Sequence, residues 1–221
     1  MKLLTTGWGF YPRRVEIYLL EKNIDIERVF FDMSEKWPRP DIKEFTPLGT
    51  VPVLVTEQGQ AIRASLPILE YLEERFPTPN LLGETPEDRA RTRELVSVLD
   101  EASTYFTNWC KNASPMFAGF VEQSPEAGKA AAEMYWGRQR MVDALMGETD
   151  GPFAAGHAVT IADCIAMASL QYVKEMYGVP LPPDCPTLAR WYANFSERPS
   201  AAVPTYPEQV RARTLGLPAP Y

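Results

Sequence analysis

Residues 7–14, Gly-Trp-Gly-Phe-Tyr-Pro-Arg-Arg, lie between a short apolar segment and an alternating apolar pattern. Glycines, a proline and aromatic residues between a strand and a helix are typical of a turn that holds a ligand. The turn contains no Ser or Cys, so its hydroxyl-bearing side chain is that of Tyr11. The residue types leave the chemistry of this turn open.

Two further turns have ligand-binding character. Residues 45–54, Phe-Thr-Pro-Leu-Gly-Thr-Val-Pro-Val-Leu, form a loop that ends at Val51–Pro52 and opens a strand. A cis bond there would present the Val51 backbone as a pairing edge to a ligand with its own peptide bond. Ser65 follows Ala64 directly before a helical pattern. We expect Ser65 to be the N-cap and the free amides beside it to form an anion site.

The elements that position these turns follow from apolar periodicity. Alternation predicts strands, spacing of three and four predicts helices, and the last two strands are expected to be antiparallel. The first part of the chain then reads strand, helix, strand, loop, strand, strand, helix. The predicted strands are 2–6, 26–32, 51–55 and 61–62, and the predicted helices are 13–22 and 66–76.

The remainder of the chain is expected to be all-helical. Helices are predicted over 87–111 and 125–147, each opened by a proline. Thr160 and Asp163 form a capping box that heads the apolar run 164–173, a role in folding and not in catalysis. The tail after Arg198 is rich in Pro and Ala and is expected to wrap the surface.

Composition excludes several function classes. A formal charge of −7, with dispersed Lys and Arg, makes nucleic acid an improbable partner. No segment is apolar and long enough to span a bilayer or act as a signal peptide, so we expect a soluble, cytoplasmic protein without a membrane partner. Three widely spaced cysteines and one histidine predict neither a disulfide framework nor a metal site. His157 is expected at the surface, and Cys110 is expected to be a buried, unreactive thiol.

The order of four motifs resembles the cytosolic glutathione transferases. These are Pro-Leu-Gly-Thr-Val-Pro-Val-Leu, the Ser65 turn, Ile-Leu-Glu-Tyr-Leu-Glu-Glu-Arg-Phe-Pro and Thr-Ile-Ala-Asp. The resemblance implies an α/β thioredoxin-like domain with a mixed four-stranded sheet over 1–78 and an all-α domain over 86–221. It also implies a cytoplasmic homodimer that uses reduced glutathione as co-substrate, needs no cofactor, and attacks a hydrophobic electrophile.

The resemblance assigns the glutathione site residue by residue. Val51 would pair with the cysteinyl backbone beside the cis proline Pro52, and Ser65 would hold the γ-glutamyl carboxylate. Phe10 would lie beside glutathione. Ala64 stands where the family usually has Glu, Gln or Asp, so the family's contact with the γ-glutamyl amine is missing here.

The resemblance also indicates where the acceptor would bind. The long helix of the second domain faces the acceptor pocket in this family, and Tyr105 and Trp109 are four residues apart on one of its faces. Trp8 is assigned to the same pocket. The loop that reaches the glycine carboxylate in relatives corresponds to the segment with Lys36, Trp37 and Arg39.

Gly9 occupies the position at which relatives carry the Ser or Cys that activates the thiol. Three alternatives follow. The amides that start the next helix stabilise a thiolate without a side chain, or a hydroxyl comes from Tyr11 or from Thr6, or the site is catalytically weak and only binds a ligand. We favour the amides assisted by Tyr11, with Tyr11 as the catalytic residue. The rival reading is a non-catalytic ligand-binding or docking module; a glutaredoxin-like enzyme is disfavoured because the turn has no Cys.

Overall fold

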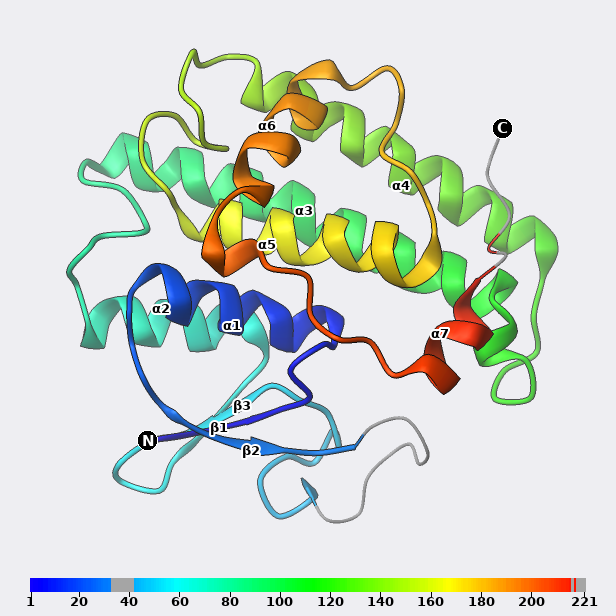
Figure 1. Cartoon of the computed structure of the whole chain (residues 1–221), viewed down its shortest axis with the longest axis horizontal. Helices are drawn as coiled ribbons and strands as arrows, with labels where there is room; N and C mark the ends of the chain where they lie inside the picture. Colours follow the sequence, from blue (N-terminus) through cyan, green and yellow to red (C-terminus); the bar gives the residue numbers. More distant parts are fainter. Residues whose placement is uncertain (33–41, 216, 218–221) are drawn as a thin grey trace.

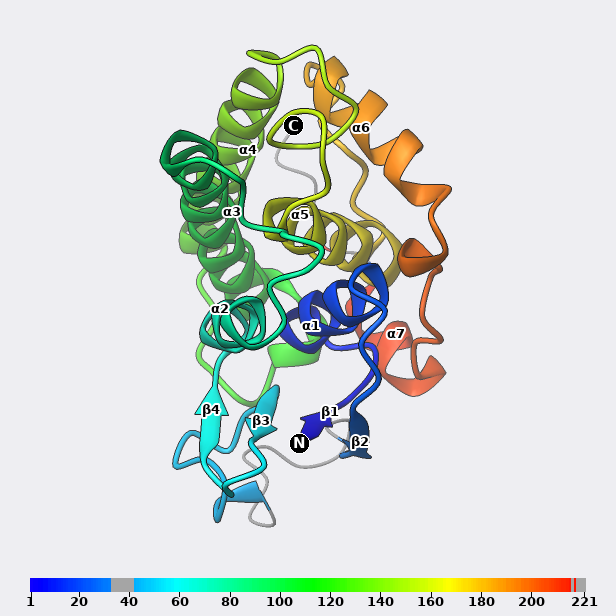
Figure 2. The ribbon, with the colours of Figure 1, turned by 90° about the vertical axis from the view of Figure 1, so that its left-hand side faces the viewer.

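The amino-terminal part of the chain is a four-stranded mixed sheet with two helices on one face (Figures 1 and 2). The computed structural model describes residues 1–32, 42–215 and 217. The sheet order is β2-β1-β3-β4, in which β1 is parallel to β2 and antiparallel to β3, and β3 is antiparallel to β4. The strands are β1 (Lys2–Thr5), β2 (Glu27–Phe30), β3 (Val53–Val55) and β4 (Ala61–Arg63). The expected fold class and the antiparallel pairing of the last two strands are confirmed.

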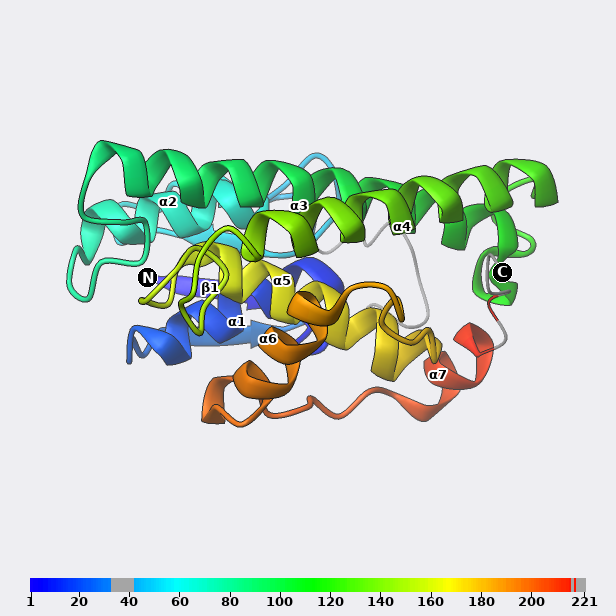
Figure 3. The same cartoon turned by 90° about the horizontal axis from the view of Figure 1, so that it is seen from above.

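The helices that follow the sheet segments make up most of the molecule. Helices α3 and α4 run side by side along its length (Figure 3). The α-helices are α1 (Phe10–Glu21), α2 (Ser65–Arg75), α3 (Pro86–Ala113), α4 (Pro125–Met146), α5 (Ile161–Gln171), α6 (Pro186–Ser196) and α7 (Glu208–Thr214). Short turns of other helix types are η2 (Pro115–Phe117), η3 (Tyr172–Met176, a π-helical turn) and η4 (Pro199–Ala201).

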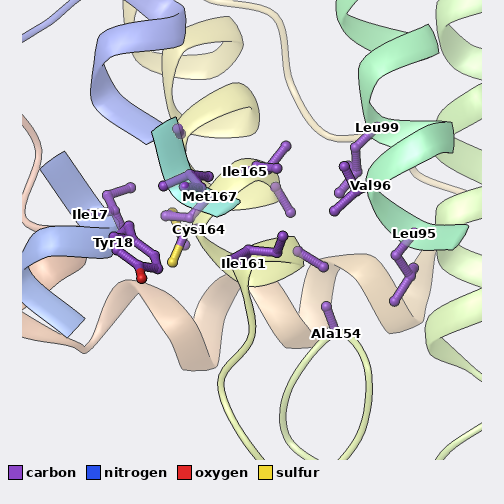
Figure 4. Close-up of a cluster of buried hydrophobic side chains, with 14 of the residues drawn as sticks. Ile17, Tyr18, Leu95, Val96, Leu99, Ala154, Ile161, Cys164, Ile165 and Met167 are labelled. Atoms are coloured by element: carbon purple, nitrogen blue, oxygen red, sulfur yellow. The ribbon is translucent and has the colours of Figure 1, made fainter. Parts of the chain in front are cut away.

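The main hydrophobic core joins the sheet-bearing part to the helical part. Figure 4 shows side chains of α1, α3 and α5 converging, among them Ile17, Leu99 and Ile165. Every residue of α5 is buried, which explains why its sequence is apolar on all sides instead of amphipathic. Because α1 packs against α5, the position of the turn that precedes α1 is fixed by the core of the helical part.

The capping box that heads α5 is confirmed. The Asp163 carboxylate accepts the Thr160 N–H at 2.8 Å and, beyond the box, the Ala154 N–H at 2.7 Å and the Trp191 indole N–H at 2.8 Å. Burial raises the pKa of Asp163, and these hydrogen bonds oppose that rise. One carboxylate thus fixes the start of α5, the preceding loop and α6.

Two predicted element boundaries were wrong near the candidate site. Helix α1 begins at Phe10 and not at residue 13, because Gly9 is its N-cap and accepts the Arg13 N–H at 2.9 Å. Pro12 therefore lies inside the first helical turn, where a missing N–H is harmless. Strand β3 begins at Val53 and not at 51, because Pro52 has no N–H to donate to the ladder.

The tail after α6 returns to α1 before it forms α7. The Arg13 guanidinium donates to the carbonyls of Ser200, at 2.9 Å, and Ala202, at 2.6 Å. Arg198 forms an ion pair of 2.7 Å with Glu21 at the other end of α1. The segment predicted to wrap the surface is therefore attached to α1 by side-chain contacts, and Figure 1 shows it running below α6 toward α7.

Candidate functional site

The strand register brings the three predicted ligand-binding turns to one edge of the sheet. Leu4 pairs with Val53, so the end of β1 adjoins the start of β3. Val53 also pairs with Arg63, so the end of β4 adjoins the same place. The turn after β1, the step before β3 and the turn after β4 are therefore neighbours, although 58 positions separate Thr6 from Ala64 in the sequence.

The start of α1 presents backbone donors at this edge. Phe10 and Tyr11 are the first two helical residues, so their N–H groups have no carbonyl of the same helix to bind. Pro12 has no N–H, and the next donor, Arg13, binds the Gly9 carbonyl. No acidic side chain lies in the first turn to neutralise the positive end of the helix dipole. The geometry suits an anion.

The start of α2 repeats this arrangement. Ser65 was expected to be the N-cap, but it is the first helical residue, and the N-cap is Ala64, whose side chain cannot accept a hydrogen bond. The N–H groups of Ser65 and Leu66 are left without intrahelical acceptors, and Pro67 has no N–H group. The next donor, the Ile68 N–H, binds the Ala64 carbonyl at 3.3 Å. Two helix N-termini, each with two N–H groups that lack an intrahelical acceptor, thus lie at one edge of the sheet.

Ala64 has an uncommon backbone conformation, with φ of 67° and ψ of 150°. A positive φ with extended ψ is a region that glycine occupies far more readily than alanine. The bond between Val51 and Pro52 is cis. Val51 itself precedes β3 and therefore lies beyond the ladder pairs of that strand, so its backbone is placed at the same edge as Ser65.

Gly9 is held by a threonine from the end of β1. The Gly9 N–H donates to the Thr6 hydroxyl at 2.9 Å. A Cβ built on Gly9 would lie 2.6 Å from that hydroxyl oxygen and 3.3 Å from the Pro12 ring. The absence of a side chain at position 9 therefore has a local cause, because the Thr6 hydroxyl fills the adjoining space.

Tyr11 is 39% exposed, so part of this residue faces solvent. The Arg14 guanidinium lies 4.8 Å from the centre of its ring, and the Phe10 ring meets it edge-on at 5.0 Å. Phe10 turns toward the helical part and packs on Phe106 at 5.9 Å and Tyr172 at 5.4 Å between ring centres. Phe10 therefore packs against aromatic side chains of the helical part, whereas Tyr11 contacts Phe10 and Arg14 of its own helix.

The three residues predicted for the acceptor pocket lie in or against one aromatic cluster. We define this aromatic cluster as Phe106, Trp109, Tyr135, Trp136 and Tyr177. Trp109 is 1% exposed and lies inside it, whereas Trp8 and Tyr105 are partly buried and pack against it. The Arg138 guanidinium of α4 lies 5.4 Å from the Tyr105 ring. Trp8 and Tyr105 thus lie at the margin of the cluster, and Trp109 lies in its interior.

Phe106 and Tyr172 contact Phe10 directly, but sequence reasoning preferred Tyr105 and Trp109 to Phe106 and did not single out Tyr172. Phe106 and Trp109 are three residues apart, so the helical period alone could have selected this pair in place of Tyr105 and Trp109. Tyr172 has no such signal, because it follows α5 in the π-helical turn η3, which shifts the periodicity of the side chains.

Other residues considered from the sequence lie elsewhere. Lys36, Trp37 and Arg39 fall outside the described residues. Cys110 is buried in the aromatic cluster region, and burial raises the pKa of its thiol, as predicted for an unreactive cysteine. His157 is exposed, with its imidazole 3.2 Å from the Asp150 carboxylate, consistent with the predicted surface position.

No three His, Cys, Asp or Glu side chains within 1–32, 42–215 and 217 gather as a metal site would require. In the same residues, no helix combines the length and the apolar character needed to cross a bilayer.

Comparisons with known proteins agree with this arrangement. Models of the glutathione S-transferase N-terminal and C-terminal domains match residues 8–75 and 114–199. Glutathione S-transferase 2 of Saccharomyces cerevisiae is 30% identical over 211 residues, which cover 90% of this chain and 87% of that protein. A probable maleylacetoacetate isomerase of Caenorhabditis elegans is 30% identical over 193 residues, covering 85% and 84%.

A solved structure of a glutathione S-transferase domain-containing protein from Marinobacter aquaeolei has a TM-score of 0.80 at 27% identity. The match covers 91% of this chain and 100% of that one. The similarity extends through both the sheet and the helical part, so it concerns the whole architecture and not a shared sheet alone. The chain belongs to the cytosolic glutathione S-transferase family.

Proposed function

We propose that this protein is a glutathione transferase in which a glutathione thiolate attacks a hydrophobic electrophile. Residues 1–78 would hold glutathione and residues 86–221 would supply the acceptor pocket. The observation that carries the proposal is the meeting of two helix N-termini and the Val51–Pro52 step at one sheet edge. That edge offers amides to two anionic groups, which matches a thiolate and a carboxylate on one peptide-like ligand.

The roles follow from the placement of each group. The Val51 backbone, beside Pro52, would pair with the cysteinyl unit, and the amides of Ser65 and Leu66 would bind the γ-glutamyl carboxylate. Ala64 contributes through its backbone conformation, since its methyl group offers no polar contact. Phe10 would flank the bound peptide from the start of α1.

The chemical step would begin with loss of the thiol proton to water. The amides of Phe10 and Tyr11 and the positive end of α1 would favour the thiolate, and Tyr11, which is 39% exposed, would donate its hydroxyl proton to the sulfur. The sulfur lone pair then forms the new C–S bond, and the leaving group departs with its bonding electrons, or the electrons move into the acceptor in an addition. Trp8, Tyr105 and the buried Trp109 behind them would form the apolar side that orients the acceptor.

The test is the rate at which the protein conjugates glutathione to 1-chloro-2,4-dinitrobenzene above the uncatalysed rate. We expect turnover that falls about tenfold in Tyr11→Phe, the loss of one hydrogen bond to a charged group. Tyr71→Phe, on α2, is the matched control and should leave the rate unchanged. A wild-type rate equal to the background, with glutathione still bound, would favour the rival non-catalytic binding module.

We also propose a cytoplasmic homodimer with a role in detoxification, on the basis of family membership. Analytical ultracentrifugation at micromolar concentration should give twice the chain mass of 24.9 kDa. A sedimenting species of one chain mass would contradict the dimer and leave the proposed chemistry intact.

A further inference from the structure

The Thr6 hydroxyl has an unusual position at the proposed thiolate site. It accepts the N–H of Gly9 at 2.9 Å, and Gly9 is the N-cap of α1, beside the amides proposed to hold the thiolate. The residue is 9% exposed, whereas its neighbour Thr5 is fully buried. The Thr5 hydroxyl makes a comparable contact, accepting the Gly7 N–H at 3.1 Å. The two threonines therefore support the same turn, and of the two only Thr6 keeps any solvent-exposed area.

The hydroxyl proton of Thr6 is available for a further bond. A threonine hydroxyl can donate once and accept twice, and the bond with Gly9 uses one acceptor position. No acceptor for the Thr6 O–H is found in the described part of the chain. A hydroxyl that accepts from an amide is a stronger donor, because the amide dipole polarises its O–H bond.

We propose that the Thr6 hydroxyl donates to the glutathione sulfur and replaces the side chain that Gly9 lacks. This inference rests on the proposed function and adds a catalytic residue to it, on the strand side of the sulfur, opposite the start of α1. The geometry also explains Gly9. Thr6 oxygen lies 2.6 Å from where a Cβ of residue 9 would be, so a side chain at 9 and a hydroxyl at this place exclude each other.

The first test measures the pKa of glutathione bound to the full chain, from the ultraviolet absorption of the thiolate across pH. Thr6→Val keeps the shape of the side chain and removes its hydroxyl, whereas Thr6→Ser keeps the hydroxyl. We expect Thr6→Val to raise the pKa of the bound thiol by roughly one to two units, the effect of one hydrogen bond to a charged group. Thr6→Ser should stay near wild type.

Thr5→Val is the matched control, since it removes the equivalent support of the turn at Gly7 and changes a residue that is fully buried. It should change the free energy of unfolding about as much as Thr6→Val and leave the thiol pKa unchanged. Equal pKa shifts in the two variants would show that the turn, and not the hydroxyl, is responsible, and would overturn the inference.

The second test moves the hydroxyl group from residue 6 to residue 9. Gly9→Ser alone should lower activity, because its Cβ collides with the Thr6 hydroxyl. Thr6→Ala should raise the thiol pKa, and adding Gly9→Ser to Thr6→Ala should restore it at least in part, because the space is then open. A double variant whose bound thiol has a pKa no lower than that in Thr6→Ala would contradict the proposal that hydroxyls at residues 6 and 9 can replace each other.

The outcomes separate this inference from the proposed function. A wild-type complex with a lowered thiol pKa that Thr6→Val does not alter would overturn the role of Thr6 and leave the transferase proposal standing. A wild-type protein that binds glutathione without lowering its thiol pKa would overturn both.

Discussion

Arg14 of α1 and Asp100 of α3 form an ion pair with nitrogen and oxygen 2.5 Å apart. The arginine side chain is 1% exposed, whereas the aspartate side chain is 39% exposed. The guanidinium also donates to the Ser103 hydroxyl at 2.6 Å and lies beside the Tyr11 ring. This pair connects the start of α1, where the proposed thiolate site lies, to the long helix of the helical part.

Asp100→Ala is expected to lower the free energy of unfolding by about 3 kcal/mol. The substitution leaves a buried guanidinium without its counter-charge, and the partial exposure of Asp100 keeps the cost at the low end of the range for such pairs. Urea unfolding measures the change. Glu101→Ala is the control, because Glu101 pairs with Arg138 at the surface and should cost below about 1 kcal/mol. Equal costs for the two variants would contradict this account.

Ala64→Gly is expected to stabilise the protein by about 1 kcal/mol. The positive φ of Ala64 is strained for alanine and not for glycine, and the relief exceeds the added entropy of glycine in the unfolded chain. Ala61→Gly in β4 should have the opposite sign, because a strand interior loses stability with glycine. Thermal unfolding compares the two. Destabilisation by Ala64→Gly would show that this backbone conformation is not strained.

Glu21→Gln is expected to change how the free energy of unfolding depends on pH in the acid range. Burial raises the pKa of Glu21, but hydrogen bonds from Arg198 and Ser200 outweigh burial and hold it below its usual value. The folded pKa is thus below the unfolded value of about 4.3, so the stabilisation is complete above that pH and is lost as pH falls through the folded pKa.

Unfolding free energies of wild type and Glu21→Gln should therefore differ at pH 7 and converge as the pH falls below about 4. The control is Glu27→Gln, at an exposed position in β2. Its free energy of unfolding should change with pH as that of the wild type does. A constant difference between wild type and Glu21→Gln down to the acid transition would exclude a lowered pKa for Glu21.

The cysteines are expected to be unreactive in the native protein. Cys110, Cys164 and Cys185 are all buried, and burial raises the pKa of each thiol, that of Cys185 to about 11. A thiol reagent should modify them slowly at neutral pH and label all three after denaturation. Cys110→Ala should retain conjugation. Loss of activity in that variant without loss of stability would revive a mechanism through the protein's own cysteine.

Local patterns were sufficient for the elements and for the capping box at Asp163, because their signals lie within one helical turn. The boundaries near the site were harder to predict. Pro12 suggested a turn, yet it lies in the first turn of helix α1, where proline costs no hydrogen bond. The sequence therefore indicated ligand-binding turns but did not locate the helix ends within them.

Contacts between distant segments could not be predicted from spacing. Phe106 and Tyr172 meet Phe10 through the packing of α1 on α3 and α5, and no local pattern encodes that approach. The hydrogen bond between the Gly9 N–H and the Thr6 hydroxyl joins residues three positions apart, but it depends on the path of the backbone through the turn. Gly9 looks like a missing catalytic residue in the sequence, and the structure supplies a steric reason for it.

The most direct test of the central claim is calorimetry with reduced glutathione, followed on the same sample by titration of the bound thiol. We predict micromolar binding and a thiol pKa clearly below the value of about 8.5 that is usual for a free thiol. The absence of binding at millimolar glutathione would contradict the claim that the sheet edge at Val51, Ser65 and the start of α1 is a glutathione site.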